Sequence, residues 1–296
     1  APWFGRAASL LVGLLFGRWK LAAEQRAAFD PWDSLPTFPP GARQSPENTP
    51  DVLCDDSGHV ADWETCLRSA TEVDDVVLGE LVKERLSDGR LRALLRESFF
   101  QQHIGAYTSS RRKAPIYWQL ATQSASYSVW LYYHRFTRDT LYRVLNDYVA
   151  PKLKHEERKL LGLVQDSGPN PSASHRKEID AQERFVDELR VFHEEVARVA
   201  PLWNPDLNDG VIINFAPLWR LVPQHKPWQK ECKACWDKLV AGDYDWAHLA
   251  MHLWPERVVP KCTTDRSLAI AHDLEEVFWE DGTDGKWKPK KVGKDV

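Results

Sequence analysis

Apolar residues recur mostly at helical spacing along this chain. In residues 175–199 they fall on one face, with charged residues between them, as in an amphipathic helix. The segment 168–174 is rich in proline, serine and other turn-forming residues and separates this helix from another long one, so an antiparallel helical hairpin is expected. Similar spacing predicts further helices at residues 3–29, 60–70, 75–87, 91–100, 228–240, 246–253, 255–259 and 267–279.

Two short segments have the composition of strands instead. Residues 116–121 and 127–133 are rich in β-branched and aromatic side chains, and the residues between them are polar and turn-prone, which predicts a β-hairpin. Thr137 follows as the predicted N-cap of a helix that Pro151 stops or kinks. The expected fold class is α+β, mainly α-helical with a small β-hairpin or sheet around residues 115–133.

Prolines and charges divide the chain into regions. Prolines cluster in residues 30–50 and again in residues 201–227, where the backbone is predicted to be extended or irregular. Four regions are expected: residues 1–100, a helical segment with a proline-rich linker and an acidic stretch at 51–80; residues 101–160, a basic aromatic hairpin plus helix; residues 161–281, a helical C-terminal region; and residues 282–296, a flexible tail.

Length and composition bound the class of protein. The 296 residues suffice for one large domain or two smaller ones. The longest apolar run, residues 10–16, is far shorter than the roughly 20 residues of a membrane span, so a cytoplasmic protein without a membrane partner is expected. The five cysteines fit reduced thiols better than a disulfide framework. Because the only methionine is Met251, the sequence is expected to be a piece of a longer protein.

Charge is distributed unevenly. Residues 111–159 contain ten lysines or arginines against four acidic residues, whereas the whole chain has a formal net charge of −4. Nine tyrosine, tryptophan and phenylalanine side chains lie among these cations. Cations next to aromatic faces are typical of surfaces that meet phosphates or unstacked bases. The alternative is that many of the rings are buried as half of an ordinary strand core.

Two patterns bear on metal binding. His248, His252 and Glu256 share one face of a predicted helix, but a helical zinc peptidase needs a glutamate directly after its first histidine, so packing or hydrogen bonding is favoured. Cys232 and Cys235 form a CxxC motif without a second closely spaced pair, which favours two half-buried thiols on a helix. A metal-dependent enzyme using the two histidines remains an alternative.

Other motifs point to stability or are missing. No glycine-rich nucleotide loop and no nucleophile elbow occurs, and the chain offers no catalytic constellation. Two charged pairs lie where apolar helical runs begin. Glu256 and Arg257 follow a proline, and Asp265 and Arg266 follow a threonine. We expect these four side chains to cap helices or to form ion pairs that stabilise the fold.

Several segments together resemble a known family. They look like the C-terminal half of PglX-type adenine-specific DNA methyltransferases of BREX phage-defence systems, in the same order along the chain. The segments are residues 8–21, 111–149, 207–218, 243–258 and 262–279. The family's catalytic Asn-Pro-Pro-Tyr motif, which holds a flipped adenine, is absent here, as is a glycine motif for S-adenosylmethionine.

The resemblance implies a DNA-recognition or interaction region that lies downstream of a methyltransferase domain. In that interpretation this fragment needs no cofactor and transfers no methyl group, while S-adenosylmethionine binds to the full-length parent. The expected partner is double-stranded DNA. Arg111, Arg112 and Lys113 are predicted to contact phosphates. Four residues further along are predicted to touch bases or to pack beneath them, and they are Tyr117, Tyr132, His134 and Arg135.

A scaffold for other phage-defence proteins is the second interpretation. Its contact surfaces would be the acidic stretch at residues 51–80 and the long helical hairpin.

Overall fold

A computed structural model gives the fold of the chain. It describes residues 12–13, 15–16, 50–63, 65–66, 92–93, 96, 99–106, 108–109, 112–113, 115–282 and 286–290. The predicted fold class is confirmed, because helices dominate these residues and the largest sheet has three strands. Most of the helices predicted at residues 3–29, 60–70, 75–87 and 91–100, and the proline-rich segment, lie outside the described residues. In the described part of the chain, no helix has the length and apolarity to cross a membrane.

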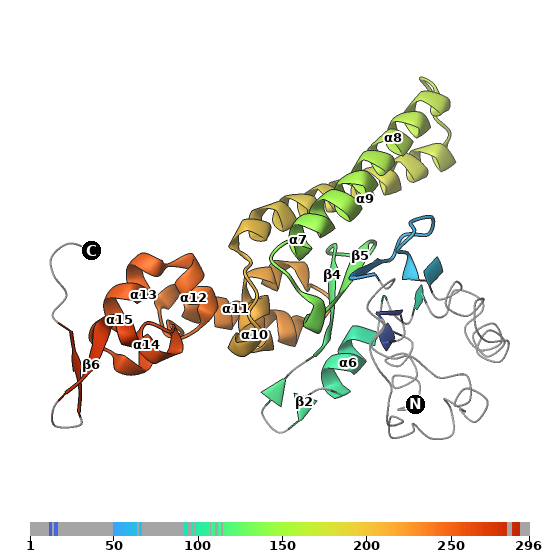
Figure 1. The fold of residues 1–296 in the computed structure, drawn as a ribbon. Coiled ribbons are helices and arrows are strands. Elements are labelled where there is room, and N and C mark those ends of the chain that lie inside the picture. The colour runs from blue at the N-terminus through green and yellow to red at the C-terminus, as the bar shows by residue number, and fades with distance from the viewer. Residues whose placement is uncertain are drawn as a thin grey trace, which may run out of the picture.

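The central sheet contains the predicted hairpin. Strands β4 (Tyr117–Ala121) and β5 (Ser128–Tyr132) pair antiparallel, and β1 (Val52–Cys54) adds to the other edge of β5. Every residue of the three strands is buried. A smaller two-stranded sheet precedes the hairpin and joins β2 (Thr108–Ser109) to β3 (Arg112–Lys113). The sheet is therefore a core element, flanked on the N-terminal side by α6 (Phe100–Ala106) (Figure 1).

The segment after the hairpin is helical, but it neither starts at Thr137 nor stops at Pro151, as the prediction allowed. Helix α7 (Thr140–Arg143) has Asp139 at its N-cap position, and the backbone N–H of Thr137 instead donates to the hydroxyl of Thr140. Pro151 does not end the helix. The helical backbone is continuous from α7 through a wide π-helical turn (η3, Val144–Val149) into α8 (Ala150–Ser167), and Pro151, which has no N–H to donate, directly follows that turn.

The predicted helical hairpin is confirmed. Helix α9 (Ala173–Val199) returns antiparallel along α8, and the hydroxyl of Ser172 caps it by accepting from the backbone N–H of His175 at 3.2 Å. Figure 1 shows this pair projecting away from the sheet. The apolar face of α9 is buried only in its second half, from Val186 onward, so the outer part of the hairpin has no core of its own.

Residues 200–221 are not irregular as predicted. They form four short helices in succession: η4 (Ala200–Leu202), η5 (Leu207–Asp209), α10 (Val211–Phe215) and η6 (Ala216–Leu221). The prolines in η4 and η6 occupy first-turn positions, which leave helical hydrogen bonding intact. The indole of Trp203 donates to the carbonyl of Asn214 at 2.7 Å and ties the segment together.

The C-terminal region consists of short helices and one small hairpin. In order, these are α11 (Lys226–Ala241), α12 (His248–Leu253), α13 (Pro255–Cys262), α14 (Arg266–Ala271), α15 (Glu275–Phe278), β6 (Trp279–Asp281) and β7 (Trp287–Pro289). The single helix predicted at residues 267–279 is divided at Asp273, whose φ of 56° is left-handed. Part of the segment predicted as a tail, residues 287–289, pairs with β6 as strand β7.

Two hydrophobic cores organise the molecule. The sheet core surrounds β4 and β5, and the C-terminal core lies among α12 to α15. Helix α11 contributes to both, because Trp228 and Cys232 belong to the sheet core while Cys235 and Leu239 belong to the C-terminal core. Figure 1 accordingly shows α10 and α11 between the sheet and the C-terminal helices.

Candidate functional site

The tyrosines of the hairpin are core residues. Tyr117 and Tyr132 face each other across β4 and β5, and their relative exposures are 0% and 2%. The ring of Phe16 stacks on Tyr117 with the planes 10° apart. His103 accepts from the backbone N–H of Tyr117 at 3.1 Å and fixes the start of the strand. Of the two roles predicted for these tyrosines, the structure shows them packing beneath the surface.

The other predicted contact residues lie near the ends of the hairpin. His134 is exposed in the short helix η2 (Tyr133–Arg135), and Arg135 is partly buried there. Arg111 lies outside the described residues. The backbones of Arg112 and Lys113 form β3, and their side chains lie outside the description. His134 and Arg135 therefore lie side by side in one short helix after the hairpin, and the phosphate contacts of residues 111–113 stay a prediction.

Several cations of the basic stretch form ion pairs within the chain. Asp51 pairs with Arg143 at 2.6 Å and with Arg135 at 3.6 Å. Asp56 pairs with Lys152 at 2.7 Å. Burial lowers the pKa of Lys152, but hydrogen bonds from its ammonium to Asp56 and Glu156 outweigh burial, so the pKa is raised. The local excess of positive charge is thus partly neutralised by carboxylates that are distant in sequence.

We use the name acidic segment for residues 51–62, which supply these carboxylates. Two more of its carboxylates, those of Asp55 and Asp62, are buried. Arg92 donates two hydrogen bonds of 2.9 Å to Asp62 and also contacts Asp55, which pairs with Arg96 at 2.7 Å. The acidic segment therefore binds cations from two parts of the chain, Arg92 and Arg96 before the hairpin and Arg135, Arg143 and Lys152 after it.

Some cations remain available at the surface. Arg138, Lys154 and Arg158 are exposed, and none of them forms an ion pair with a described residue. Lys154 and Arg158 are four residues apart on α8, so their side chains project from the same face. These exposed cations lie on the helical segment that follows the hairpin.

Three of the four charged side chains predicted to cap or pair, Arg257, Asp265 and Arg266, do so, although Arg257 acts at the end of a helix and not at a start. Arg257 contacts Asp245 at 2.6 Å and donates to the carbonyls of Leu239 and Val240 at 2.8 Å, at the end of α11. Lys261 also pairs with Asp245 at 2.6 Å. Burial raises the pKa of the Asp245 carboxyl, but hydrogen bonds from Lys261 and Arg257 outweigh it and lower the pKa.

The second predicted pair, Asp265 and Arg266, lies at the start of α14. Asp265 is the N-cap of α14 and accepts from the backbone N–H of Leu268 at 3.2 Å. Arg266 pairs with Glu275 at 2.6 Å, and its guanidinium lies 4.3 Å from the centre of the Trp287 ring. Glu256 lies in the first turn of α13, where the helix dipole favours an acidic side chain.

The histidine and cysteine patterns have structural explanations. Buried Asp209 accepts from the backbone N–H groups of His248 and Leu249, both at 2.8 Å, and so caps α12. The His248 imidazole lies 2.9 Å from the same carboxylate, and that hydrogen bond raises its pKa. Cys232 and Cys235 are buried free thiols on α11, and burial raises the pKa of Cys235 to about 12. Within the described residues, no three side chains gather as a metal site.

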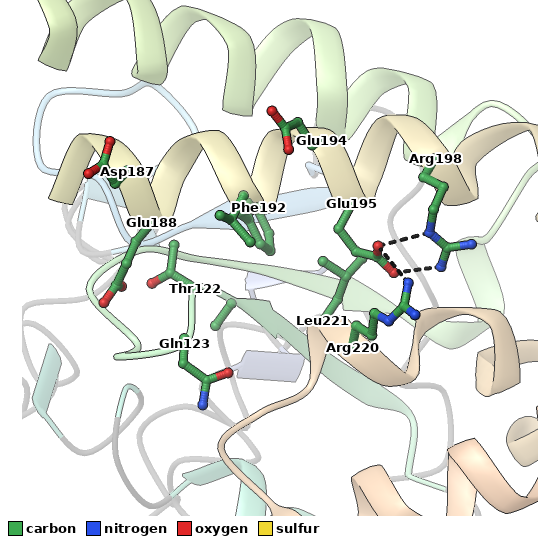
Figure 2. A pocket seen from close by; sticks show the side chains of 12 residues that line it. Thr122, Gln123, Asp187, Glu188, Phe192, Glu194, Glu195, Arg198, Arg220 and Leu221 are labelled. Carbon is green, nitrogen blue, oxygen red and sulfur yellow. Dashed lines mark hydrogen bonds and ion pairs between the residues drawn. The ribbon is translucent and has the colours of Figure 1, made fainter. Parts of the chain in front are cut away.

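A cavity of about 480 Å³ opens between α9, η6 and the turn that joins β4 to β5. Figure 2 shows α9 along one side and the turn with Thr122 and Gln123 opposite it. We call this cavity the α9 groove. Its lining residues are Ala121, Thr122, Gln123, Asp187, Glu188, Val191, Phe192, Glu194, Glu195, Arg198, Arg220 and Leu221.

Carboxylates dominate the charge of the groove. Glu195 pairs with Arg198 at 2.6 Å and with Arg220 at 3.4 Å, as the dashed lines in Figure 2 mark. Glu188 accepts instead from the uncharged hydroxyls of Ser124 and Ser126, at 2.6 and 3.0 Å. The groove therefore contains carboxylate charge that its own arginines do not neutralise.

Comparison with known proteins gives two related methyltransferases. The adenine-specific methyltransferase PglX of Lacticaseibacillus casei (strain Zhang) is 31% identical over 137 residues, which cover 44% of this chain. The adenine-specific methyltransferase BrxX of Escherichia coli O9:H4 (strain HS) is 25% identical over 141 residues, or 46% of this chain. Over slightly less than half of its length, the chain is therefore related to PglX-type adenine-specific methyltransferases. The match covers only 11% of the length of each relative. No protein-family model matches the chain.

This relationship agrees with the family resemblance of the sequence, but sequence reasoning missed two features. The acidic stretch at residues 51–80 was interpreted only as a contact surface, although Asp51 and Asp56 within it pair with cations some 90 residues away. The α9 groove was missed as well. A signal for it exists, since residues 187, 188, 191, 194, 195 and 198 share one helical face, but that spacing does not show which face stays exposed.

Proposed function

We propose that this chain is the C-terminal DNA-recognition and interaction region of an N6-adenine DNA methyltransferase that acts in phage defence. The observation that carries the proposal is the similarity to two adenine-specific methyltransferases, PglX and BrxX. The printed sequence lacks Asn-Pro-Pro-Tyr, so in this proposal the methyl transfer takes place on another part of the parent protein. S-adenosylmethionine is then a cofactor of the parent and not of this region.

The proposed contact surface runs from the start of the hairpin to α8. Residues 111–113 precede the hairpin, His134 is exposed where the chain leaves the hairpin at the same open end, and Lys154 and Arg158 project from α8. Guanidinium and ammonium groups on such a surface bind phosphates without regard to sequence, whereas base contacts give specificity. The buried tyrosines support this surface from below, because they hold the strands in register.

Binding of duplex DNA at two salt concentrations tests the proposal. Replacing Arg111, Arg112 and Lys113 by alanine is expected to weaken binding equally on cognate and random duplex. It also lowers the slope of log affinity against log salt by up to about 3, since each phosphate contact contributes roughly 0.9. The matched control replaces Lys226, Lys230 and Lys233 on α11 and removes the same charge. Equal behaviour of wild type and the first triple variant contradicts the predicted phosphate contacts.

Arg135 tests the specificity part of the proposal. If its guanidinium reads a base edge, Arg135→Ala narrows the difference in binding free energy between cognate and random duplex by roughly 1 to 3 kcal/mol. A uniform loss on both duplexes assigns Arg135 to phosphate binding instead. The pairing with Asp51 makes this measurement informative, because the guanidinium must leave that carboxylate to reach a base.

One observation favours a second function, a scaffold for other defence proteins. The helical hairpin projects from the body and exposes Leu161 and Val164 on α8, at 58% and 46%. Apolar side chains of this size on a protruding element are common in protein contacts. Two results together would establish this second function. The chain would not bind duplex DNA at low salt, and it would bind a defence protein through a contact that Leu161→Ser abolishes.

A further inference from the structure

The α9 groove combines an apolar floor with an acidic rim. Val191 is 66% exposed within it, and the buried side chains of Phe192 and Leu221 continue the apolar surface inward. A single exposed valine is unremarkable on a protein surface, but here it lines a cavity whose volume of about 480 Å³ falls in the usual range for binding pockets. Covering accessible apolar surface inside a cavity with a second apolar group removes both from water, which favours binding.

The charge of the rim restricts what can bind. Asp187 is compensated by Arg190 at 3.1 Å, and Glu195 by Arg198. Glu188 accepts only from uncharged groups, the hydroxyls of Ser124 and Ser126 and the backbone N–H of Ser124, and Glu194 has no hydrogen-bond or ion-pair partner among the described residues. These two carboxylates repel phosphates and attract cations. A nucleic acid is therefore a poor occupant of this face, even when it binds elsewhere on the chain.

The shape of the groove favours a polypeptide. Its helical side extends over residues 187–198, which at 1.5 Å per residue is about 17 Å, or three helical turns. A compact ligand would cover one end of this length, whereas a helix or an extended segment covers all of it. The opposite side is held in place, because Glu188 binds the turn of the hairpin through Ser124 and Ser126. Such a preformed groove loses little conformational entropy on binding.

We propose that the α9 groove is the docking site for a basic amphipathic segment of a partner protein. In this complex one large apolar side chain of the partner covers Val191 and Phe192. Lysines or arginines beside it pair with Glu188 and Glu194. The proposal concerns a face separate from the DNA contacts proposed above and stands without them.

Titration with two model peptides tests the docking site. One is a fluorescent 15-residue amphipathic peptide of leucine and lysine, and the other has glutamate in place of every lysine. Fluorescence anisotropy is expected to show binding of the lysine peptide alone. Glu194→Lys is expected to weaken it by tenfold or more, and Val191→Asn by several fold. The matched control Glu178→Lys makes the same charge change on the opposite face of α9 and is expected to alter affinity less than twofold.

Two outcomes overturn the proposal. Equal losses for Glu194→Lys and Glu178→Lys show that the peptide binds the general negative charge of the chain and not the groove. Equal binding of both peptides shows that the rim does not select cations. Circular dichroism of each variant verifies folding, and hydrogen exchange of the complex is expected to protect residues 187–198 and 121–123. Binding of duplex DNA by Glu194→Lys is expected to be undiminished, so failure here is distinct from failure of the proposed function.

Discussion

Two aspartates beside the sheet, Asp51 and Asp56, and two aspartates of the C-terminal region, Asp245 and Asp209, each bind basic side chains, but the two sets are buried to different depths. Asp51 and Asp56 have side-chain exposures of 34% and 19%, and their cationic partners also reach solvent. Asp245 and Asp209 are 5% and 1% exposed. Asp245 binds Arg257 and Lys261, and Asp209 caps α12 and binds the His248 imidazole. The burial of the carboxylate matters because a phosphate can replace an exposed carboxylate in an ion pair but cannot reach a buried one. We therefore expect a phosphate to displace the carboxylate from the first pairs but not from the second.

The largest effect is expected from breaking a buried pair. Arg257→Ala removes the guanidinium that contacts Asp245 and two carbonyls at the end of α11. We expect the free energy of unfolding to fall by about 2 to 3 kcal/mol, since Lys261 still compensates part of the carboxylate charge. Urea denaturation measures this loss, and exposed Arg158→Ala is the control. Unchanged stability together with weaker DNA binding would assign Arg257 to the contact surface.

A smaller effect on stability, with a gain in binding, is expected from the exposed pairs. The double variant Asp51→Asn with Asp56→Asn removes the carboxylate charge that faces Arg135, Arg143 and Lys152, although Lys152 keeps its ion pair with Glu156 at 2.8 Å. Unfolding free energy is expected to fall by about 1 kcal/mol or less. Affinity for duplex DNA is expected to rise severalfold, with a salt slope steeper by up to about 3.

The control for this experiment is Glu178→Gln with Asp180→Asn, which removes the same charge from the outer part of α9. If both double variants raise DNA affinity equally, the effect comes from net charge. In that case the acidic segment does not compete with phosphates for the three cations.

The smallest effect is expected from His248, whose side chain is 37% exposed. Its hydrogen bond with Asp209 raises the pKa of the folded imidazole above the ordinary 6.5. The resulting stability is fully present below the unfolded pKa and is lost as pH rises through the folded one. The difference in unfolding free energy between wild type and His248→Gln is therefore expected to be larger at about pH 5.5 than at about pH 8.5. The same comparison in an Asp209→Asn background is expected to show no such trend.

Local patterns were sufficient for the elements whose partners are close in sequence. The β4–β5 hairpin and the α8–α9 hairpin were predicted because in each the two elements are joined by one short turn and pack against each other. Asp265 and Arg266 were assigned correctly for the same reason, since capping and pairing there reach no further than Glu275. The break at Asp273 was missed, because nothing in the apolar spacing indicates a left-handed residue.

Long-range electrostatics could not be predicted from one sequence. The cations of residues 111–159 indicated an open basic surface, yet Arg143 and Lys152 meet carboxylates that no local pattern connects to them. The hairpin aromatics were ambiguous in the same way, since the alternation of a strand shows which rings share a face but not what covers that face. Phe16 covers Tyr117, and only the tertiary fold shows it.

Strand β1 also bears on the order in which the chain folds. Its neighbour Asp51 is 92 residues from Arg143, and Asp56 is 96 residues from Lys152, so these contacts close far longer loops than either hairpin. The two hairpins can form from adjacent segments, and contacts of that kind form quickly. We therefore expect β1 to join the sheet late, both in refolding and during synthesis, when it leaves the ribosome well before β5. Until then Arg143 lacks Asp51 and Lys152 has only Glu156, so this face of the incompletely folded chain carries more uncompensated positive charge than the same face of the native fold.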